Sequence, residues 1–397
     1  MIADVFSVDA LEVAKQFNLK TYAYCASSGC VALQGKDLID SVQQRTIESY
    51  KTILHISKGL DLADGIILNS FMDLERKIIT ALQENKNKYP PIYPLGPILQ
   101  SELASINETA SKCLKWLDNQ PPNSVLYVSF GSGGTLSHDQ LNELALGLEM
   151  SGHKFLWAMR ASNGFAYSAY LNEQKEDPFD YLPKGFLERI KDQGFVLPSW
   201  APEIEVLRHG STRAFLTHCG WNSTLECVFY GKPIIVWPLS AEQRMNAVML
   251  SEELKIAVRP KENANNDGII VEKEEVSRIV KSVMEGDKGK EINRRIQVFK
   301  DAAAKALGKD EQRMNAVLIT EELKIALWLK KDHDNNKGIV RKEEVCRIVK
   351  RVMEGDEGKE INRKIQVYKD VATKALSDDG SSTKTLSCLL SDLLNGK

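Results

Sequence analysis

The chain has 397 residues, 43% of them hydrophobic, which is enough to build one or more buried cores and excludes a disordered protein. Its 52 basic residues nearly balance its 54 acidic residues, giving a net charge of −2. A charge so close to zero argues against nucleic acid as a partner, because polyanions bind to strongly positive surfaces.

Seven cysteines, an odd number, are scattered without a Cys-x-x-Cys pair, which fits neither a disulfide framework nor a zinc site. They are Cys25, Cys30, Cys113, Cys219, Cys227, Cys346 and Cys388. Behind Met1 there is no basic segment followed by an apolar run, and no apolar stretch is long enough to span a membrane. We therefore expect a cytoplasmic protein in a reducing compartment, with no membrane span and no bound metal.

The N-terminal region combines the helix and strand patterns of an α/β protein. Apolar residues recur at helical spacing near the start of the chain, at Ala10, Val13, Ala14 and Phe17. Strand-like runs follow at residues 21–25 and 65–70. Because nothing resembling a first strand comes before them, we expect the chain to begin partway through an α/β domain.

Residues 89–97, YPPIYPLGP, contain four of the chain's 13 prolines and cannot form a helix or a central strand. We interpret them as an interdomain linker that closes an N-terminal domain at residues 1–97. In the following region, residues 98–307, short apolar runs are separated by helix-length amphipathic segments. The runs lie at residues 124–130, 154–160, 213–217 and 233–237. Buried strands that alternate with helices predict a parallel sheet.

The C-terminal third contains a tandem repeat. Residues 242–257 recur at residues 311–326 with 13 of 16 positions identical. Solenoid proteins stack three or more units, so two near-identical copies favour the duplication of a segment inside one domain. We interpret residues 308–376 as a duplicate of about 242–307, followed by a C-terminal helix at 377–397. A helical interaction module built on the repeat is the alternative.

The densest group of polar motifs lies between residues 200 and 243. A strand-like run ends at the turn His218-Cys219-Gly220, and a helix pattern begins at Trp221. A strand that passes through a glycine turn into a helix presents free N–H groups and the positive end of the helix dipole, which suits a phosphate. Asn222 and Ser223 add side-chain donors, and His218 could donate to the same anion.

Further side chains of this segment suit a nucleotide sugar. Glu226 lies four residues beyond Asn222, on the same helical face, where a carboxylate can accept both hydroxyls of a ribose. Trp200 offers a flat face for a base. Glu242 and Gln243 follow the next strand and suit hexose hydroxyls. Singly, each residue is better explained as a cap, a core residue or a solvated side chain, whereas together they favour a ligand site.

A second glycine turn, Gly131-Ser132-Gly133-Gly134, follows the strand-like run at 124–130. It matches neither the G-x-G-x-x-G motif nor the P-loop, which disfavours a nicotinamide-dependent oxidoreductase. Ser132 could reach a phosphate from the side opposite the helix start.

These motifs in register, W-A-P, H-C-G-W-N-S, Glu226 and Glu242-Gln243, resemble the donor-binding signature of plant family 1 UDP-glycosyltransferases. The resemblance covers nearly the whole chain through FGSGG, YPLGP, PLSAEQRMNAVML and ALSDDGSSTK, and is closest to the hydroquinone and monolignol glucosyltransferases. It implies a GT-B fold of two Rossmann-like domains, with the acceptor on the N-terminal domain and UDP-glucose, a co-substrate rather than a cofactor, on the C-terminal one.

The resemblance also assigns roles residue by residue. Trp200 would stack on uracil, Ala201 would contact the base through its backbone, and Glu226 would bind the ribose diol. The diphosphate would be held by His218, Asn222, Ser223 and Ser132. The hexose would be held by Trp221, Glu242 and Gln243.

Two departures from the family pattern affect the expected site. Glu203 stands where the family usually has glutamine, which puts an extra carboxylate near the base and ribose and should weaken UDP binding. Asp4 matches the aspartate that supports the family's catalytic histidine, but the histidine itself would lie upstream of Met1. No other histidine of the chain stands in that motif. The first sheet should also lack its opening strands.

The sequence therefore predicts an inverting, metal-independent UDP-glucose-dependent O-glucosyltransferase that acts on small phenolic acceptors. The alternative is a catalytically impaired remnant that binds the UDP-sugar and transfers little. We expect a monomer that could associate through unpaired sheet edges.

Overall fold

The computed structural model describes most of the chain up to residue 306. The described residues are 2–17, 21–27, 46, 48–84, 89–99, 108–161, 177–198, 200–265 and 268–306, with the single positions 351, 356, 359, 360 and 363. Apart from those single positions, the predicted duplicate at 308–376 and the predicted C-terminal helix at 377–397 lie outside the described residues.

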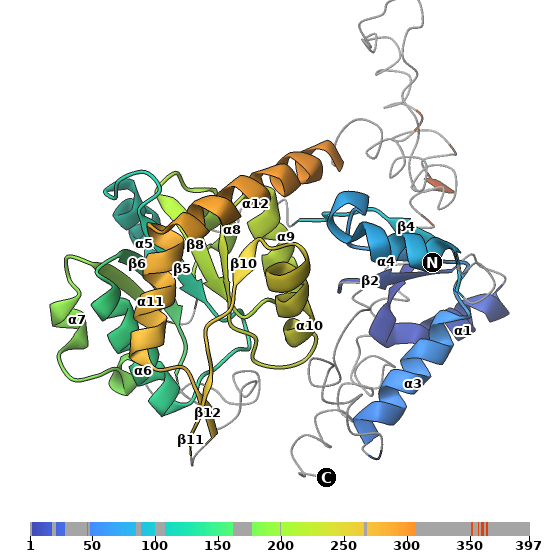
Figure 1. Cartoon of the computed structure of the whole chain (residues 1–397). Helices are drawn as coiled ribbons and strands as arrows, with labels where there is room; N and C mark the ends of the chain where they lie inside the picture. Colours follow the sequence, from blue (N-terminus) through green and yellow to red (C-terminus); the bar gives the residue numbers. More distant parts are fainter. Residues whose placement is uncertain are drawn as a thin grey trace, which may run out of the picture.

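The first of two parallel sheets has the strand order β1-β2-β3-β4 (Figure 1). Its strands are β1 (Ile2–Asp4), β2 (Tyr22–Cys25), β3 (Gly65–Leu68) and β4 (Ile92–Pro94). The helices between them are α1 (Val8–Gln16), which follows a short 3-10 turn η1 (Val5–Ser7), α3 (Glu48–Leu60) and α4 (Met72–Glu84). The proline-rich segment that we interpret as a linker contains β4. This strand lies at the edge of the sheet and pairs only with β3, so its prolines remove no hydrogen bond to a second neighbouring strand.

The predicted N-terminal helix is confirmed as α1, and half of its predicted apolar positions face the core: Ala14 is buried and Ala10 packs against it, whereas Val13 and Phe17 do not. The buried residues are Val8, Leu11 and Ala14, whereas Val13 is 52% exposed and Phe17 is 71% exposed. Two apolar stripes of helical spacing overlap in this segment. Val8, Leu11 and Ala14 pack against the first sheet and α3, so packing rather than periodicity decides which stripe is buried.

The second sheet is also parallel and has the order β10-β9-β8-β5-β6-β7. The strands are β5 (Val125–Ser129), β6 (Lys154–Met159), β7 (Gly194–Pro198), β8 (Thr212–Thr217), β9 (Ile234–Val236) and β10 (Ala257–Val258). Four of these, β5, β6, β8 and β9, match the four predicted runs. A small antiparallel pair, β11 (Asn263–Asn265) and β12 (Gly268–Ile270), projects from this body.

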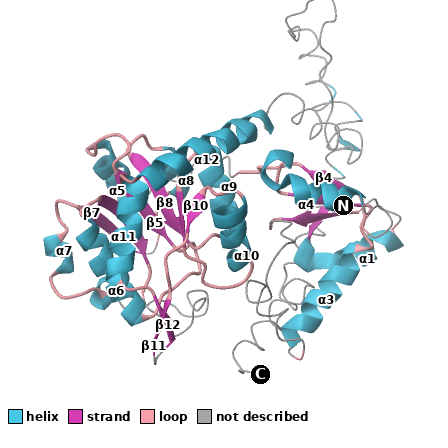
Figure 2. Cartoon of the chain, viewed as in Figure 1, coloured by secondary structure: helices cyan, strands magenta, loops and turns pink. Residues whose placement is uncertain are grey.

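Helices cover both faces of the second sheet, so that its strands are buried on both sides (Figure 2). One face packs against α5 (Glu108–Asp118), α8 (Glu203–Arg208), α9 (Trp221–Tyr230) and α12 (Asp287–Ala306). The other packs against α6 (His138–Ser151) and α11 (Lys273–Met284). The remaining short elements are η4 (Pro178–Tyr181), α7 (Phe186–Arg189), α10 (Gln243–Val248) and a π-helical turn at Met249–Glu253. Alternation along β5 divides the core, since Val125 and Tyr127 face the first layer while Leu126 and Val128 face the second.

The start of α9 joins the second sheet to the first. The indole N–H of Trp221 donates to the main-chain carbonyl of Asn69 at 2.6 Å, and both residues are buried. Asn69 follows β3, and its side-chain amide hydrogen-bonds to the main chain of Ile98. Phe71 belongs to the same apolar cluster as Trp221. The core of the second sheet therefore extends to the chain that leaves β3.

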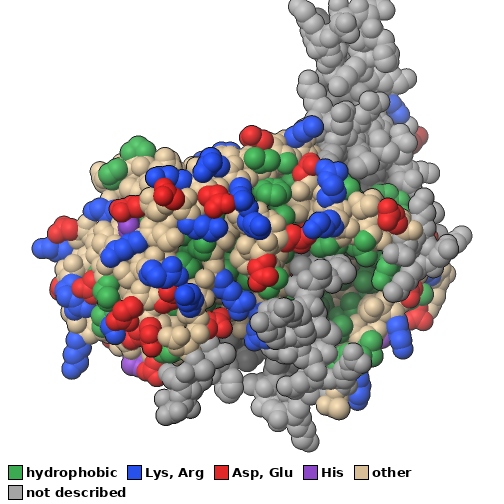
Figure 3. All heavy atoms as spheres, viewed as in Figure 1, with side chains coloured by type: hydrophobic (Ala, Val, Ile, Leu, Met, Phe, Trp, Pro, Cys, Tyr) green, Lys and Arg blue, Asp and Glu red, His purple; other side chains and the backbone are tan. Residues whose placement is uncertain are grey.

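The surface agrees with the near balance of charges in the sequence. On the face shown in Figure 3, basic and acidic side chains are interspersed over the body built on the second sheet. None of the helices in the described part is both long enough and apolar enough to cross a membrane.

We expect Trp221→Phe to be less stable than the wild type. The change leaves the buried carbonyl of Asn69 without its indole donor, which costs about 1–3 kcal/mol. Urea unfolding followed by circular dichroism measures the difference. Trp200 is 41% exposed, so the control Trp200→Phe should unfold like the wild type. Equal stabilities of the two variants would contradict the role of this hydrogen bond.

Candidate functional site

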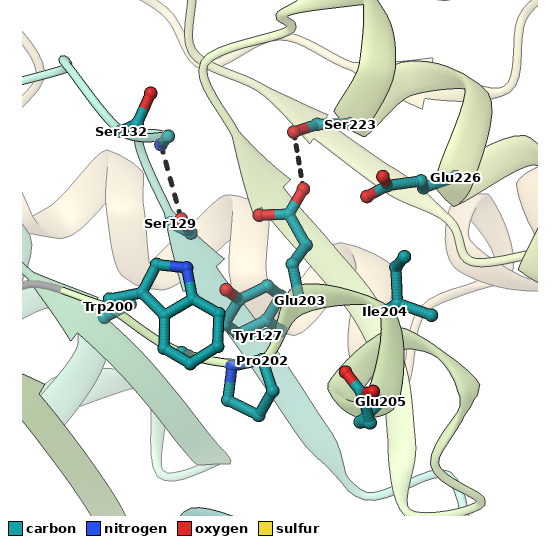
Figure 4. A pocket seen from close by; sticks show the side chains of 13 residues that line it. Tyr127, Ser129, Ser132, Trp200, Pro202, Glu203, Ile204, Glu205, Ser223 and Glu226 are labelled. Atoms are coloured by element: carbon teal, nitrogen blue, oxygen red, sulfur yellow. Dashed lines mark hydrogen bonds between the residues drawn. The ribbon is translucent and has the colours of Figure 1, made fainter. Parts of the chain in front are cut away.

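A cavity of about 210 Å³ opens at the carboxyl edge of the second sheet (Figure 4). Strands β5 and β6, the glycine turn after β5, the segment after β7 and the first turns of α9 all contribute to its wall. The lining residues are Tyr127, Ser129, Gly131, Ser132, Ala158, Trp200, Ala201, Pro202, Glu203, Ile204, Glu205, Ser223 and Glu226.

Strand register brings these segments together. Ser129, the last residue of β5, pairs with Ala158 of β6 on one side and with Thr217 of β8 on the other. Because the three strands are parallel, the turns that follow them leave the sheet at the same edge. The turn at Gly131 therefore lies beside His218, although 87 residues of sequence separate the two positions.

The structure brings six of the predicted site residues together in the cavity wall. They are Ser132, Trp200, Ala201, Glu203, Ser223 and Glu226. Trp200, predicted to stack on a base, is 41% exposed, and Figure 4 shows its ring across the cavity from Glu226.

His218 lies next to this wall, packed between two glycine turns. A Cβ atom on Gly131 would be 2.6 Å from the imidazole Cε1, and one on Gly220 would be 2.6 Å from its Nε2. Burial lowers the pKa of His218 to about 4. At neutral pH the ring is therefore uncharged and can donate one N–H to a ligand without bringing a positive charge.

The helix start predicted after the glycine turn is confirmed. Helix α9 begins at Trp221 with Gly220 as its N-cap residue, and no side chain caps its first N–H groups. Its first turn contains no acidic residue. The positive end of the α9 dipole thus lies beside Ser223 at the cavity wall, where it favours negative charge on a ligand.

The other predicted residues do not line the cavity. Asn222 is exposed in the first turn of α9, and Trp221 uses its indole N–H on Asn69. Gln243 is buried, and its Oε1 accepts hydrogen bonds from the main-chain N–H groups of Leu239 and Ser240.

Two predicted acids also lie outside the cavity wall. Glu242 precedes α10 and is half-buried, and burial raises its pKa. Asp4 is exposed at the end of β1 in the first sheet, where it accepts a hydrogen bond from the N–H of Phe6.

Three glutamates line the cavity, and no lysine or arginine does so among the described residues. Glu203 and Glu226 line the same wall, and the hydroxyl of Ser223 donates to Glu203 at 2.5 Å. Burial, reinforced by the nearby charge of Glu203, raises the pKa of Glu226 to about 8. Burial also raises the pKa of Glu203. No trio of residues suited to hold a metal ion occurs in the described ranges.

Sequence reasoning missed half of the wall. Tyr127, Ser129 and Gly131 were not assigned to the site, although their spacing of two places them on one side of β5 and its extension. Glu205 was also missed, and the sequence held no signal for it, because residues two apart on a helix such as α8 do not share a face. The remaining missed residues are Ala158, Pro202 and Ile204.

The region that contains the cavity is similar in sequence to known proteins. A family model described as "UDP-glucoronosyl and UDP-glucosyl transferase" matches residues 92–309, which include every residue of the cavity wall. The chain belongs to this family of UDP-glycosyltransferases. The protein is therefore a UDP-glycosyltransferase, an enzyme that transfers a hexose from a UDP-sugar.

Individual relatives agree with the family assignment. UDP-glycosyltransferase 72B1 of Arabidopsis thaliana is 46% identical over 343 residues, which cover 78% of this chain and 71% of the relative. Hydroquinone glucosyltransferase of Rauvolfia serpentina is 44% identical over 350 residues, covering 80% and 74%.

A solved structure extends the comparison to the fold. Phytolacca americana UGT2, complexed with UDP-2-fluoro-glucose and pterostilbene, superposes with a TM-score of 0.71 at 44% identity, covering 81% of this chain and 75% of that one. The predicted GT-B fold with two parallel Rossmann-like sheets is confirmed.

Gly131→Ala should weaken the binding of UDP, because the new methyl group would displace the ring of His218. Losing one hydrogen bond to a charged group costs about 1.5–3 kcal/mol, so we expect at least roughly tenfold weaker binding by calorimetry. Gly152→Ala is the matched control. Its φ of +72° is close to the +73° of Gly131, but no atom lies within 4 Å of the added Cβ. A similar loss of UDP affinity in both variants would indicate backbone strain instead.

Proposed function

We propose that the chain transfers glucose from UDP-glucose to a small phenolic acceptor, with inversion at the anomeric carbon and without a metal ion. The UDP-sugar is a co-substrate. The observation that carries this proposal is the arrangement of the cavity: an exposed indole face, a buried carboxyl across from it, and a helix N-terminus at the wall.

The nucleoside half of the donor fits the cavity itself. The face of Trp200 stacks on uracil, and the main chain of Ala201 contacts the base. Glu226, across the cavity from Trp200, accepts the ribose hydroxyls (Figure 4). An acidic group suits a vicinal diol because its two oxygens accept both hydroxyls.

The diphosphate fits the rim between the two glycine turns. Ser132 approaches from the turn after β5, His218 from the turn after β8, and Asn222 and Ser223 from the first turn of α9. Since no lysine or arginine lines the described wall, N–H groups and the helix dipole supply the stabilisation of the two phosphate charges. The neutral state of His218 at pH 7 suits a donor of a single hydrogen bond.

The residues proposed for the hexose and the acceptor lie outside the cavity wall. Glu242 and Gln243, at the start of α10, are proposed to bind glucose hydroxyls together with Trp221, and Asp4 is proposed to support the catalytic base. Similarity to a hydroquinone glucosyltransferase, and to a structure that contains pterostilbene, supports a phenolic acceptor. We place the enzyme in the cytoplasm as a monomer.

Titration of the purified 397-residue chain with UDP-glucose, followed by an assay of glucose transfer to hydroquinone, tests the proposal. We expect saturable binding and formation of the hydroquinone glucoside. Binding without transfer would support the alternative of a donor-binding protein that transfers little. Absence of UDP-glucose binding would contradict the proposed function.

Trp200→Ala should bind UDP-glucose more weakly without losing stability. Stacking of a base on an aromatic side chain contributes about 1–3 kcal/mol, so we expect a loss of roughly 5- to 100-fold in affinity. Phe17→Ala, which removes another exposed aromatic side chain far along the sequence from the cavity, is the control and should bind like the wild type. Wild-type affinity of Trp200→Ala would exclude stacking at this position.

A further inference from the structure

The side chain of Glu203 reaches from one helix of the cavity wall to the next. Glu203 begins α8, and the hydroxyl of Ser223, in the first turn of α9, donates to its Oε1 at 2.5 Å (Figure 4). Both residues line the cavity, and α8 packs against α9. The carboxyl of Glu203 is therefore held at the N-terminal end of α9 by a direct side-chain contact.

Helix α9 has no acid of its own at this end. Its first turn contains no acidic residue, and no side chain caps its first N–H groups. The positive end of a helix dipole attracts a negative group, whether that group belongs to a ligand or to the protein. Among the described wall residues no lysine or arginine competes for the carboxyl of Glu203. Glu203 thus lies where the phosphate of a ligand would also be favoured.

The contact engages a hydrogen-bond donor that the diphosphate needs. A serine hydroxyl has one proton to donate, so while Ser223 donates to Glu203 it cannot donate to a phosphate. This holds in either charge state of Glu203, because the carbonyl oxygen of a neutral carboxyl accepts a hydrogen bond as well. Only two side-chain hydroxyls at the proposed diphosphate position belong to the described cavity wall, those of Ser132 and Ser223. Engagement of one of them therefore matters for phosphate binding.

We propose that Glu203 competes with the diphosphate for the hydroxyl of Ser223 and thereby lowers the preference of the cavity for a nucleoside diphosphate over the bare nucleoside. This inference rests on the proposed function, in which Ser223 holds the diphosphate. UDP must take the hydroxyl from Glu203 and lie beside its carboxyl. Uridine has no phosphate and does neither. Glu203 is thus a specificity-determining residue that acts through Ser223.

A second acid of the same wall separates this competition from the effect of charge. Glu205 also lies on α8 and is 8% exposed, and its Oε1 has no hydrogen-bond partner among the described residues. Replacing Glu205 removes a carboxyl from the wall but releases no hydroxyl of Ser223. Glu205→Met is therefore the matched control for Glu203→Met, since both exchange a carboxyl for an unbranched apolar side chain of similar length.

The test is calorimetric titration of the wild type, Glu203→Met and Glu205→Met with UDP and with uridine at one pH and one salt concentration. The quantity compared is the affinity for UDP divided by the affinity for uridine, in which contacts to the base and the ribose cancel. Glu203→Met should raise this ratio about fivefold more than Glu205→Met does, because UDP no longer has to break a hydrogen bond of the protein.

Removal of the Ser223 hydroxyl provides a second arm. In chains that also carry Ser223→Ala there is no hydroxyl to release. Glu203→Met should then raise the ratio by no more than Glu205→Met does. In the same cycle, Ser223→Ala should lower the ratio more in the presence of Glu203→Met than in the otherwise wild-type chain, because only then is the hydroxyl free to bind phosphate.

Each other outcome has a distinct meaning. Equal ratios for Glu203→Met and Glu205→Met would overturn the proposal, as would an excess for Glu203→Met that persists with Ser223→Ala, which would assign the effect to the position of the charge. If the contact only joins α8 to α9, Glu203→Met and Ser223→Ala would lower the stability to urea and leave the ratio unchanged, which also overturns it.

Two further results keep the test decisive. If Glu203→Met does not fold, Glu203→Gln keeps the shape of the side chain and can turn its amide N–H groups toward Ser223, so the ratio should rise in the same direction, and an unchanged ratio overturns the proposal. Failure of the wild type and of every variant to bind UDP would contradict the proposed function. Binding of UDP with a ratio that does not depend on Glu203 contradicts this inference alone.

Discussion

The register between β5 and β8 determines where the site forms. Ser129 pairs with Thr217, so the turn at Gly131 and the turn at His218 leave the sheet side by side, and the imidazole packs against Gly131 and Gly220 at distances that no side chain on either glycine would allow. A shift of one residue would turn Tyr127 and Ser129 to the opposite face of the sheet and separate the two turns. The apolar core on both faces fixes this register, and thereby places the free N–H groups of α9 beside the cavity.

Burial of acids is the second constraint, and it acts against the first. Under the proposed function the cavity admits a doubly charged donor, yet its described wall contains three glutamates and no lysine or arginine. Helix α9 offers positive potential at its N-terminus. Glu226 lies about one turn further along α9, and Glu203 and Glu205 lie in the neighbouring α8. Burial raises the pKa of Glu226 to about 8, which keeps this carboxyl mostly protonated at pH 7 and reduces the negative charge of the wall.

Much of the fold could be predicted because its signals are local. The apolar run at 213–217 became β8 (Thr212–Thr217), and the glycine turn before Trp221 became the start of α9. What depends on distant partners could not be predicted. The indole N–H of Trp221 donates to a carbonyl 152 residues away in sequence, and no pattern around Trp221 reveals that partner. Gln243 differs, because its partners Leu239 and Ser240 are local and only the shape of the loop before α10 brings their N–H groups to its Oε1. On α1, two apolar stripes were equally helical, and only contact with the first sheet and α3 distinguished them.

A crystal structure of the chain grown with UDP-glucose tests the central claim most directly. The account predicts density for uracil against the indole of Trp200, the ribose hydroxyls at Glu226, and the diphosphate between the Gly131 turn and the first turn of α9. Density for the nucleotide in another part of the molecule, with this cavity filled only by solvent, would contradict the assignment of the donor site.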